Sequence, residues 1–537
     1  MDRKELPIGV QTFATIRSGD YYYVDKTGYA MQLAKWRTCF LSRPRRFGKS
    51  LFIDTLAEMF AGHKALFEGL ACYDEWDWDT VYPVVRLSFA GGRLRDPAAL
   101  DERIIAQLHR NAMRLGLGPM PEYRIPDLFI WLIQEAEQVH GQQVVVLVDE
   151  YDKPILDNLT NTDLAVQMRD GLANVYSVLK DQEAHLRFVM LTGVSQFSHV
   201  SIFSELNNLD DISLSEAFSA VCGYTEDDLD EVFGPELEGL DRDEVRDWYN
   251  GYNWDGTAVY NPYDLLLLFR HRKLRSYWFG TGTPAFLVET LRSRRFFAPN
   301  LARSYATSDL LSNFDIADIT VEALLFQSGY LTITGTEVVG GTTYYILGYP
   351  NREVRDAMNS TLLAWLIDDT SGAEGHRRKL RLLLEAGQTE ALEEFVVSLF
   401  AGIPYQWFTR NDIGTQEGFY SSVFYACVAG SGLDPVAEES SNHGRLDLAV
   451  RVGAQVYVFE FKMVDDEPEG MALAQIKDRG YADKYLADRV PVHLVGIEFS
   501  RTKRTVVGFE TETIQPRRSD RADQTLAEFS DEIGLVD

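Results

Sequence analysis

The stretch Cys39-Phe40-Leu41-Ser42-Arg43-Pro44-Arg45-Arg46-Phe47-Gly48-Lys49-Ser50-Leu51 decides the fold of the first part of this chain. The apolar run Cys39–Leu41 indicates a short strand, and Leu51–Phe60 has the apolar spacing of a helix. The loop between them ends in Gly-Lys-Ser, which offers backbone N–H groups, a lysine for the β- and γ-phosphates and a hydroxyl for Mg²⁺. The helix that follows points its positive dipole end at the same place. This order predicts a nucleotide site made by Arg45, Arg46, Phe47, Gly48, Lys49 and Ser50.

The general pattern for such a loop requires a glycine at position 43, where this chain has Arg43. The tripeptide alone is common by chance, so the prediction depends on a second element downstream. Val144–Val148 is an uninterrupted apolar run, typical of a strand buried on both faces, and it ends in Asp149-Glu150. We expect Asp149 to help Ser50 hold Mg²⁺ and Glu150 to polarise the attacking water. The two elements together predict an ATP site. The loop arginines are expected to hold phosphates or to contact an adjoining domain.

A third element follows the strand-like run Arg187–Thr192. A polar residue at the end of this strand is in the right place to sense the γ-phosphate. We favour Thr192, with Ser195 as the second choice; a plain strand-end turn explains the same residues equally well.

Length, composition and charge bound the class of protein. A chain of 537 residues is too long for one hydrophobic core, so several domains are expected. The net charge of −29 argues against a protein that coats nucleic acid non-specifically, although it leaves room for a local basic groove. The four cysteines are scattered, the first residues lack a signal-peptide core, and no apolar run has the length of a membrane span. We therefore expect a cytoplasmic protein without a membrane partner.

The order of the elements predicts an α/β protein with a parallel sheet in residues 1–212 and a helical lid in residues 213–300. Residues 301–387 contain short helices around two strand-like pieces, Gly329–Thr334 and Thr343–Gly348, which we interpret as a small helical, winged-helix-like region with a linker. Residues 388–537 form a second α/β pattern. It consists of a helix near 418–427, strands at 445–452 and 455–462, one helix over 471–486 and a strand at 490–499.

Charged residues in the second α/β pattern suggest metal-dependent phosphodiester cleavage, which needs carboxylates for Mg²⁺ and a lysine near the attacking water. Glu460 and Lys462 point to the same side of one strand, although the run around them reads as core, and buried charges need a reason. The neighbouring strand is expected to bring Asp447 beside them. Glu417 offers a further carboxylate, and Gln475 a supporting amide, from nearby helices. His443 is interpreted as a loop residue beside the site.

Several motifs together resemble the bacterial and archaeal AAA-ATPase-like family. They match in order over residues 1–285: Tyr22-Tyr23-Val24-Asp25-Lys26-Thr27, Arg43–Ser50, Val148-Asp149-Glu150-Tyr151-Asp152, Leu191–Ser195, Ser204–Leu209 and Trp248-Tyr249-Asn250-Gly251-Tyr252. Arg-Pro-Arg-Arg-Phe-Gly-Lys-Ser looks like this family's own form of the phosphate loop. The resemblance implies an AAA-like ATPase fold and binding of Mg-ATP. Sites of this kind are often completed by an arginine from a neighbouring subunit or from the lid, for which Arg169 and Arg187 are candidates.

The C-terminal pattern Asp447…Glu460-Phe461-Lys462 resembles the PD-(D/E)XK nuclease superfamily in the version found behind AAA-ATPase-like domains. That resemblance implies Asp447, Glu460 and Lys462 as catalytic residues, with Glu417, Asp447 and Glu460 as metal ligands. The expected protein is an ATPase coupled to a Mg²⁺-dependent nuclease, which acts on DNA rather than RNA and is compatible with a homo-oligomer. The alternative is a signalling switch whose nuclease-like domain only binds nucleic acid or protein. A role in defence against foreign DNA rests on analogy.

Overall fold

The computed structural model describes residues 3–196, 209–279, 298–312, 320–403, 417–441 and 444–516. His443 and most of the motif at 204–209 lie outside these ranges. The chain forms two compact units, residues 1–296 with 300–355 and residues 297–299 with 356–537. The finer boundaries at residues 212, 300 and 387 stay predictions.

The first unit is built on a five-stranded sheet in the order β2-β3-β4-β1-β5. The strands are β2 (Val84–Ser88), β3 (Val144–Asp149), β4 (Leu186–Gly193), β1 (Thr38–Ser42) and β5 (Asp210–Asp211), and all their pairings are parallel. Every residue of β1 and β3 is buried, as continuous apolar runs covered on both faces require. The predicted parallel sheet is therefore confirmed. The two-residue β5 was not predicted.

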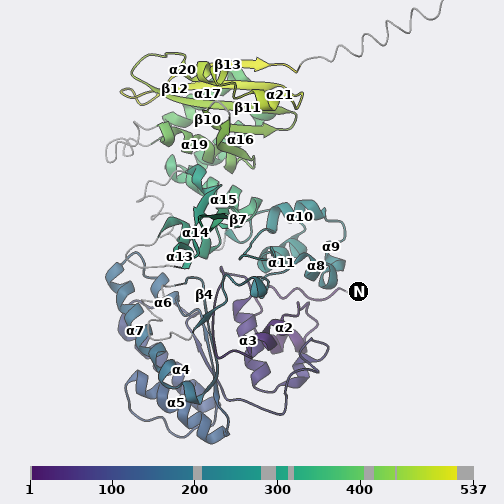
Figure 1. The fold of residues 1–537 in the computed structure, drawn as a ribbon, viewed down its shortest axis with the longest axis vertical. Coiled ribbons are helices and arrows are strands. Elements are labelled where there is room, and N and C mark those ends of the chain that lie inside the picture. The colour runs from purple at the N-terminus through teal and green to yellow at the C-terminus, as the bar shows by residue number, and fades with distance from the viewer. Residues whose placement is uncertain are drawn as a thin grey trace, which may run out of the picture. The chain divides into compact units, whose positions relative to one another are not determined.

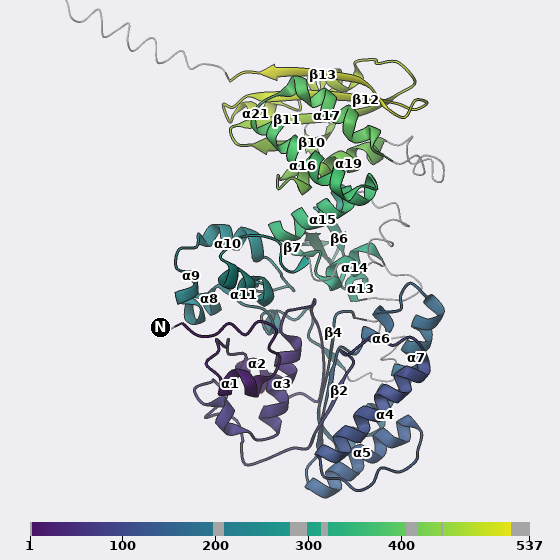
Figure 2. The same cartoon turned by 180° about the vertical axis from the view of Figure 1, so that it is seen from behind.

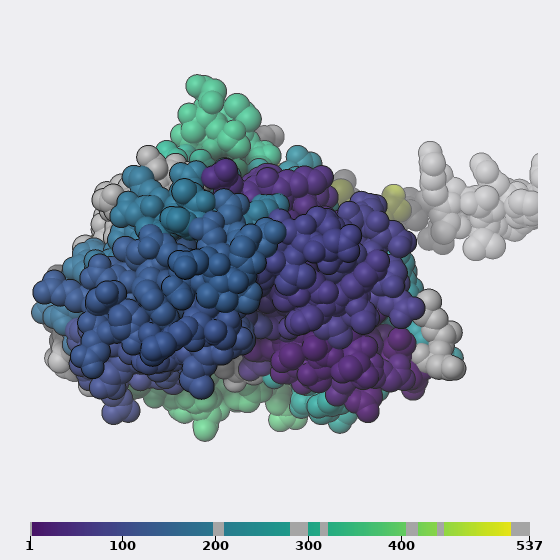
Figure 3. Space-filling view, turned by 90° about the horizontal axis from the view of Figure 1, so that it is seen from below, coloured from purple at the N-terminus to yellow at the C-terminus, as the bar shows by residue number. Residues whose placement is uncertain are grey.

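Helices cover both faces of this sheet (Figures 1 and 2). One group consists of α1 (Phe13–Ser18), α2 (Thr27–Leu33) and α3 (Lys49–Phe60), and the opposite group of α4 (Pro97–Arg114), α5 (Ile125–His140), α6 (Lys153–Leu156) and α7 (Thr162–Asp181). In a space-filling view, the purple N-terminal part and the blue middle part of this unit lie directly side by side (Figure 3). Asp54 on α3 joins the first group to the sheet, because its carboxylate accepts hydrogen bonds from the backbone N–H of Phe13 at 2.7 Å and pairs with Arg86 of β2 at 2.6 Å.

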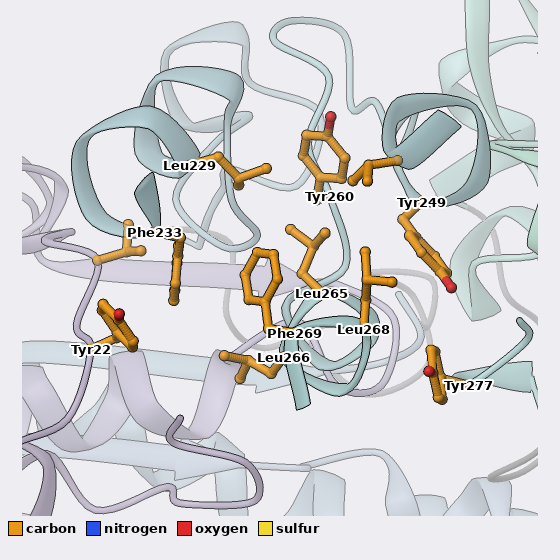
Figure 4. Close-up of a cluster of buried hydrophobic side chains, with 12 residues drawn as sticks. Tyr22, Leu229, Phe233, Tyr249, Tyr260, Leu265, Leu266, Leu268, Phe269 and Tyr277 are labelled. Atoms are coloured by element: carbon orange, nitrogen blue, oxygen red, sulfur yellow. The ribbon is translucent and has the colours of Figure 1, made fainter. Parts of the chain in front are cut away.

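The predicted helical region after the sheet contains α8 (Glu226–Val232), α9 (Gly234–Leu237), α10 (Arg242–Tyr249) and α11 (Pro262–His271). Its core gathers apolar and aromatic side chains from these helices around Phe233 and Phe269, and Tyr22 of the N-terminal segment completes it (Figure 4). Thr225 and Asp228 form a capping box at the start of α8. Asp228 also pairs with Lys26 at 2.7 Å, so the N-terminal segment is fixed to the lid by charge as well as by packing.

The remainder of the first unit is a small three-stranded antiparallel sheet in the order β6-β8-β7. It consists of β6 (Ser304–Ala306), β7 (Thr332–Val339) and β8 (Thr342–Gly348), with α13 (Ser308–Ser312) and α14 (Val321–Ser328). The strand predicted at Thr343–Gly348 is present as β8, and the one predicted at Gly329–Thr334 lies further along the chain as β7, while the winged-helix interpretation stays a prediction. Helix α15 (Arg352–Leu366) begins in the first unit and continues into the second.

The second unit contains a mixed sheet in the order β13-β12-β11-β10-β9, in which only the β11–β12 pairing is parallel. Its strands are β9 (Pro435–Ser441), β10 (Gly444–Val452), β11 (Gln455–Val464), β12 (Val492–Ser500) and β13 (Val506–Ile514). Its helices are α16 (Thr370–Glu385), α17 (Thr389–Ala401), α19 (Glu417–Gly430), α20 (Met471–Asp478) and α21 (Asp483–Leu486). The prediction of one helix over 471–486 is wrong, because Gly480 adopts a left-handed φ of 56° and separates α20 from α21.

Within the described ranges, no helix is both long enough and apolar enough to span a bilayer.

Candidate functional site

The phosphate loop follows β1 and turns sharply into α3. Gly48 has φ 95°, a value that strongly favours glycine, and Arg46 has φ 72°. Helix α3 then begins at Lys49, so that its N-terminal end lies at the loop. The local structure is the one that the order strand, loop, helix predicted.

A cavity of about 430 Å³ lies against this loop, within the size range of ligand sites. All six predicted loop residues line it, and Glu150 lines it as well. Its other walls come from the N-terminal segment near Val10 and from Tyr263 on α11. The structure thus brings the loop, one carboxylate from the end of β3 and the lid around one space.

Lys49 is buried, and its ammonium donates hydrogen bonds to the backbone carbonyls of Arg43 at 2.8 Å and Pro44 at 2.9 Å. Burial lowers the pKa of Lys49, and the negative charge of Asp149 opposes this effect. A buried ammonium held only by two neutral carbonyls is poorly compensated. The residues present therefore fit an anionic phosphate, which would give this ammonium a charged hydrogen-bonding partner.

Arg43, which replaces the first glycine, points away from the cavity and into the interior. Its guanidinium donates to the carbonyls of Ser42 (2.8 Å), Ser213 (2.8 Å) and Phe218 (3.1 Å) and lies 4.2 Å from the ring centre of Trp254. Of the two roles expected for the loop arginines, Arg43 therefore takes the contact with the adjoining lid. Arg45 and Arg46 are exposed, and the guanidinium of Arg46 lies 4.4 Å from the ring centre of Tyr263.

The side chain of Phe47 is also directed away from the cavity. It is buried against Tyr252 and Trp254, with ring centroids 4.7 and 5.3 Å apart. Only its backbone is available to a ligand, whereas Ser50 keeps a partly exposed hydroxyl at the start of α3.

The ends of β3 and β4 meet at the same edge of the sheet, next to the loop. Thr192 Oγ1 donates a hydrogen bond to Asp149 Oδ1 at 3.0 Å, and both side chains are buried. Glu150 has a left-handed φ of 51°, and burial, followed by the charge of Asp149, raises its pKa. A half-buried carboxylate with a raised pKa suits the role of general base. Asp149 and Thr192 themselves do not line the cavity but support the residues that do.

Asp152 is a residue of this edge to which sequence reasoning gave no role. Its buried carboxylate accepts hydrogen bonds from the backbone N–H groups of Val194 at 2.9 Å and Ser195 at 2.6 Å. A β-carbon at Gly193 would lie 2.6 Å from this carboxylate, so that only glycine allows the close approach. The signal available in the sequence was a charged residue in the quoted Asp149-Glu150-Tyr151-Asp152 run.

Three further candidates were predicted for the nucleotide site: Ser195 as the second choice for sensing the γ-phosphate, and Arg169 and Arg187 as arginines that complete the site. Ser195 is buried, and its backbone N–H donates a hydrogen bond to the carboxylate of Asp152. Arg169 on α7 pairs with Asp170. Arg187 lies near the start of β4, at the opposite edge from Thr192, with its guanidinium 5.7 Å from the ring centre of Tyr82. The structure does not bring either arginine to the cavity of its own chain.

In the second unit, the carboxylates of β10 and β11 meet where the two strands separate. The ladder between them ends at the pair Leu448 and Phe459. Beyond it, Asp447 Oδ2 accepts a hydrogen bond from the backbone N–H of Phe461 at 2.8 Å, and the backbone N–H of Asp447 donates to Glu460 Oε2 at 3.4 Å. The predicted juxtaposition of Asp447 and Glu460 is therefore present.

Lys462 extends the same cluster toward α19. Its ammonium lies 2.9 Å from Glu417 Oε1 and 3.1 Å from Glu460 Oε1. The amide of Gln475 on α20 donates to Glu460 Oε1. Of the residues predicted for this site, Asp447, Lys462 and Gln475 contact Glu460 directly, and Glu417 is linked to it through Lys462.

Burial and the mutual charges of this cluster shift the pKa values of its members. Burial, opposed by the hydrogen bond from Phe461, raises the pKa of Asp447 to about 6; burial and the charge of Asp447 raise the pKa of Glu460 to about 7. Burial lowers the pKa of Lys462, but Glu460 and Glu417 outweigh it and the net shift is upward. Within the described residues no three Asp, Glu, His or Cys side chains are grouped closely enough to hold a metal ion as they stand. Lys462 supplies the positive charge among the carboxylates, and the oxygen donors of Asp447 and Glu460 are of the type that Mg²⁺ prefers.

A further carboxylate, Glu498 on β12, holds the helix that carries Gln475. It is buried and accepts hydrogen bonds from the backbone N–H groups of Glu469, Gly470, Met471 and Ala472 at 2.5–3.3 Å. These groups include the orphan donors at the start of α20. Sequence reasoning missed Glu498, because a carboxylate that caps a helix 26 residues away leaves no local pattern.

Comparison with known proteins finds two family models that match parts of this chain. The family model for predicted AAA-ATPases matches residues 7–203, and the model for the PD-(D/E)XK nuclease superfamily matches residues 415–509. The chain belongs to the AAA-ATPase-like family and carries a C-terminal domain of the PD-(D/E)XK nuclease superfamily. It is also similar to a protein of Azotobacter chroococcum mcd 1 with the description "Uncharacterized protein in vnfD 5'region", at 54% identity over 516 residues. The match covers 96% of this chain and 100% of that protein.

Proposed function

We propose that this protein binds and hydrolyses ATP at the phosphate loop and that its C-terminal domain is a Mg²⁺-dependent nuclease controlled by the ATPase. The two family matches support the coarser statement of an ATPase plus a nuclease-like function. The observation that carries the finer proposal is the shared cavity of Gly48, Lys49, Ser50 and Glu150, in which the buried ammonium of Lys49 is hydrogen-bonded to two neutral backbone carbonyls.

In this proposal Lys49 leaves the carbonyls of Arg43 and Pro44 and neutralises the β- and γ-phosphates, while the backbone and the exposed Arg45 and Arg46 surround them. Ser50 and, directly or through water, Asp149 would hold Mg²⁺, which would supply charge neutralisation. Glu150 takes up the proton of the attacking water, and Thr192 orients Asp149 through the hydrogen bond at 3.0 Å.

At the second site, Asp447, Glu460 and Glu417 are the proposed metal ligands. Bound Mg²⁺ there would supply an activated water and stabilise the developing charge on the phosphate. Lys462 orients that water and offsets negative charge, and Gln475 fixes one oxygen of Glu460. The substrate is nucleic acid, for which we favour DNA over RNA, and a cytoplasmic homo-oligomer is the proposed working form.

Two assays test the proposal. The first measures hydrolysis of ATP with and without Mg²⁺ or Mn²⁺. The second measures cleavage of single- and double-stranded DNA and RNA with and without ATP and with and without either metal. Asp447→Ala is expected to abolish cleavage and leave ATP hydrolysis unchanged. Lys49→Ala is expected to weaken nucleotide binding at least tenfold, since a charged hydrogen-bonding partner is lost, while Lys35→Ala at an exposed lysine changes nothing. Cleavage that persists in Asp447→Ala, or that needs no metal, contradicts the nuclease.

The alternative is a signalling switch whose C-terminal domain only binds nucleic acid or protein, in keeping with the net charge of −29. A purified chain that hydrolyses ATP and cuts none of the four substrates with either metal would favour it.

A further inference from the structure

Two carboxyl groups in the first unit, Asp264 and Glu353, are fully buried and face each other, and neither lines the cavity at the phosphate loop. Asp264 lies on α11, and Glu353 is the second residue of α15. Within the described residues, no lysine or arginine forms an ion pair with either group. Both oxygens of Asp264 and Oε2 of Glu353 also accept no hydrogen bond from any other described group. Buried polar atoms without partners call for an explanation.

The explanation is a shared proton. Two buried carboxyl groups in contact cannot both be ionised. Glu353 Oε1 accepts hydrogen bonds from the backbone N–H groups of Tyr277 (2.8 Å), Trp278 (2.8 Å) and Phe279 (3.3 Å), which favour its charged form. Burial and the neighbouring charge of Glu353 raise the pKa of Asp264 well above its ordinary value. Asp264 therefore carries the proton and donates it to Glu353 in a hydrogen bond.

Each carboxyl group is connected to the phosphate loop through one neighbouring aromatic residue. Trp278, whose backbone N–H is bound by Glu353, donates its indole N–H to the carbonyl of Arg45 at 3.0 Å. Tyr263, the residue before Asp264, has its ring 4.4 Å from the guanidinium of Arg46. The loop is thus held at two consecutive residues, and both contacts depend on segments joined by the acid pair.

Gly329 adds a steric support to the same arrangement. It has φ 89°, and a β-carbon there would lie 2.7 Å from the side chain of Pro44 and 3.4 Å from the ring of Trp278. Glycine at this position allows the phosphate loop to seat closely against Trp278.

We propose that Asp264 and Glu353 are positioning residues of the nucleotide site, which set the shape of the phosphate loop through Trp278 and Tyr263 and transmit its state into α15. The inference rests on the proposed function, since it concerns the regulation of the same ATP site. Glu353 lies at the start of α15, and the part of this helix from residue 356 onward belongs to the second unit. Movement of the loop on binding a nucleotide therefore reaches the beginning of the second unit through continuous chain.

The test uses Trp278→Phe in the full-length chain, because this change keeps an aromatic ring and removes the indole N–H together with the five-membered ring that carries it. Loss of one such hydrogen bond predicts a two- to tenfold weaker affinity for a fluorescent, non-hydrolysable ATP analogue and a raised KM for ATP with little change in kcat. Trp78→Phe is the matched control, because Trp78 makes the same kind of bond, 2.8 Å to the carbonyl of Tyr73, and does not line the cavity.

Two further variants separate positioning from general stability. Asp264→Asn still offers a donor to Glu353 and should keep wild-type affinity, whereas Asp264→Leu leaves Glu353 Oε2 without one and should weaken affinity at least as much as Trp278→Phe. Hydrogen exchange of residues 356–366 should respond to the ATP analogue in wild type and in Trp78→Phe, and respond less in Trp278→Phe. Equal affinity and equal exchange in Trp278→Phe and Trp78→Phe overturn the inference. Absence of ATP binding in the wild type instead overturns the proposed function on which it rests.

Discussion

The ammonium of Lys49 donates a hydrogen bond to the backbone carbonyl of Arg43, 2.8 Å away. The side chain of Arg43 is directed the opposite way, toward Ser213, Phe218 and Trp254. One residue therefore fixes the loop to the lid and also holds the lysine in its resting position.

Arg43→Met should destabilise the first unit by about 2–4 kcal/mol, because three backbone carbonyls lose a charged donor and the change leaves them buried. Chemical denaturation measures the change, and Arg45→Met at the neighbouring exposed arginine is the control. A variant as stable as the wild type would show that solvent replaces these bonds at no cost.

Thr192→Val should slow ATP hydrolysis three- to tenfold and leave the affinity for ATP nearly unchanged. The valine keeps the volume but removes the hydrogen bond to Asp149 Oδ1. Steady-state kinetics with ATP provide kcat and KM. Thr361→Val, whose hydroxyl donates a hydrogen bond to the carbonyl of Ala357 within its own helix, should match the wild type. An unchanged kcat in Thr192→Val would contradict a role for this hydroxyl in hydrolysis.

Asp152 should make the stability of the first unit depend on pH. Burial, opposed by the hydrogen bond from Ser195, raises its pKa to about 6, above the value of about 3.9 in an unfolded chain. The folded state thus binds this proton more tightly, so its stabilising contribution is complete below about pH 4 and is lost as the pH rises to about 6. Two pKa units correspond to roughly 3 kcal/mol.

Asp152→Asn should therefore flatten the pH profile of the unfolding free energy between pH 4 and 6, as urea denaturation at each pH can measure. Asp157→Asn, at a carboxylate that pairs with Lys153, is the control on the same segment. An identical pH slope in wild type and Asp152→Asn would refute the raised pKa.

Glu498→Gln should lower nucleic-acid cleavage and leave ATP hydrolysis unchanged, because α20 loses the anionic cap that orients Gln475 toward Glu460. We expect a loss of about 1–3 kcal/mol in stability from the weakened bonds to four N–H groups. Glu512→Gln on the adjacent strand β13, which pairs with Lys477 at the surface, is the matched control. Full cleavage activity in Glu498→Gln would show that Gln475 needs no such support.

The sequence could predict what is local. Val144–Val148 is an unbroken apolar run, and such a strand places the following Asp149 and Glu150 at a known edge of a parallel sheet. Because residues i and i+2 of a strand face the same side, the sequence also predicted that Glu460 and Lys462 lie on one side of β11. The polar edge strand β9, Pro435–Ser441, was missed because an exposed edge imposes no regular apolar pattern.

The positioning residues could not be predicted, because each acts on backbone far away in the chain. Glu353 binds the N–H of Tyr277 across 76 positions, and Arg43 reaches the carbonyl of Ser213 across 170. No periodicity or short motif encodes such pairs. The inward direction of Phe47 was missed for the same reason, since its partners Tyr252 and Trp254 come from the lid.

The buried guanidinium of Arg43 has a consequence for how this loop evolves. A glycine-rich phosphate loop keeps its conformation through its own backbone dihedral angles, so it needs only a flanking strand and helix. Here the shape is stored partly in Ser213, Phe218 and Trp254, which lie far along the chain. Grafting Arg43–Ser50 onto another sheet would therefore transfer the sequence of the motif without its conformation. A substitution at Arg43 and a substitution at its partners in the lid must accordingly compensate each other.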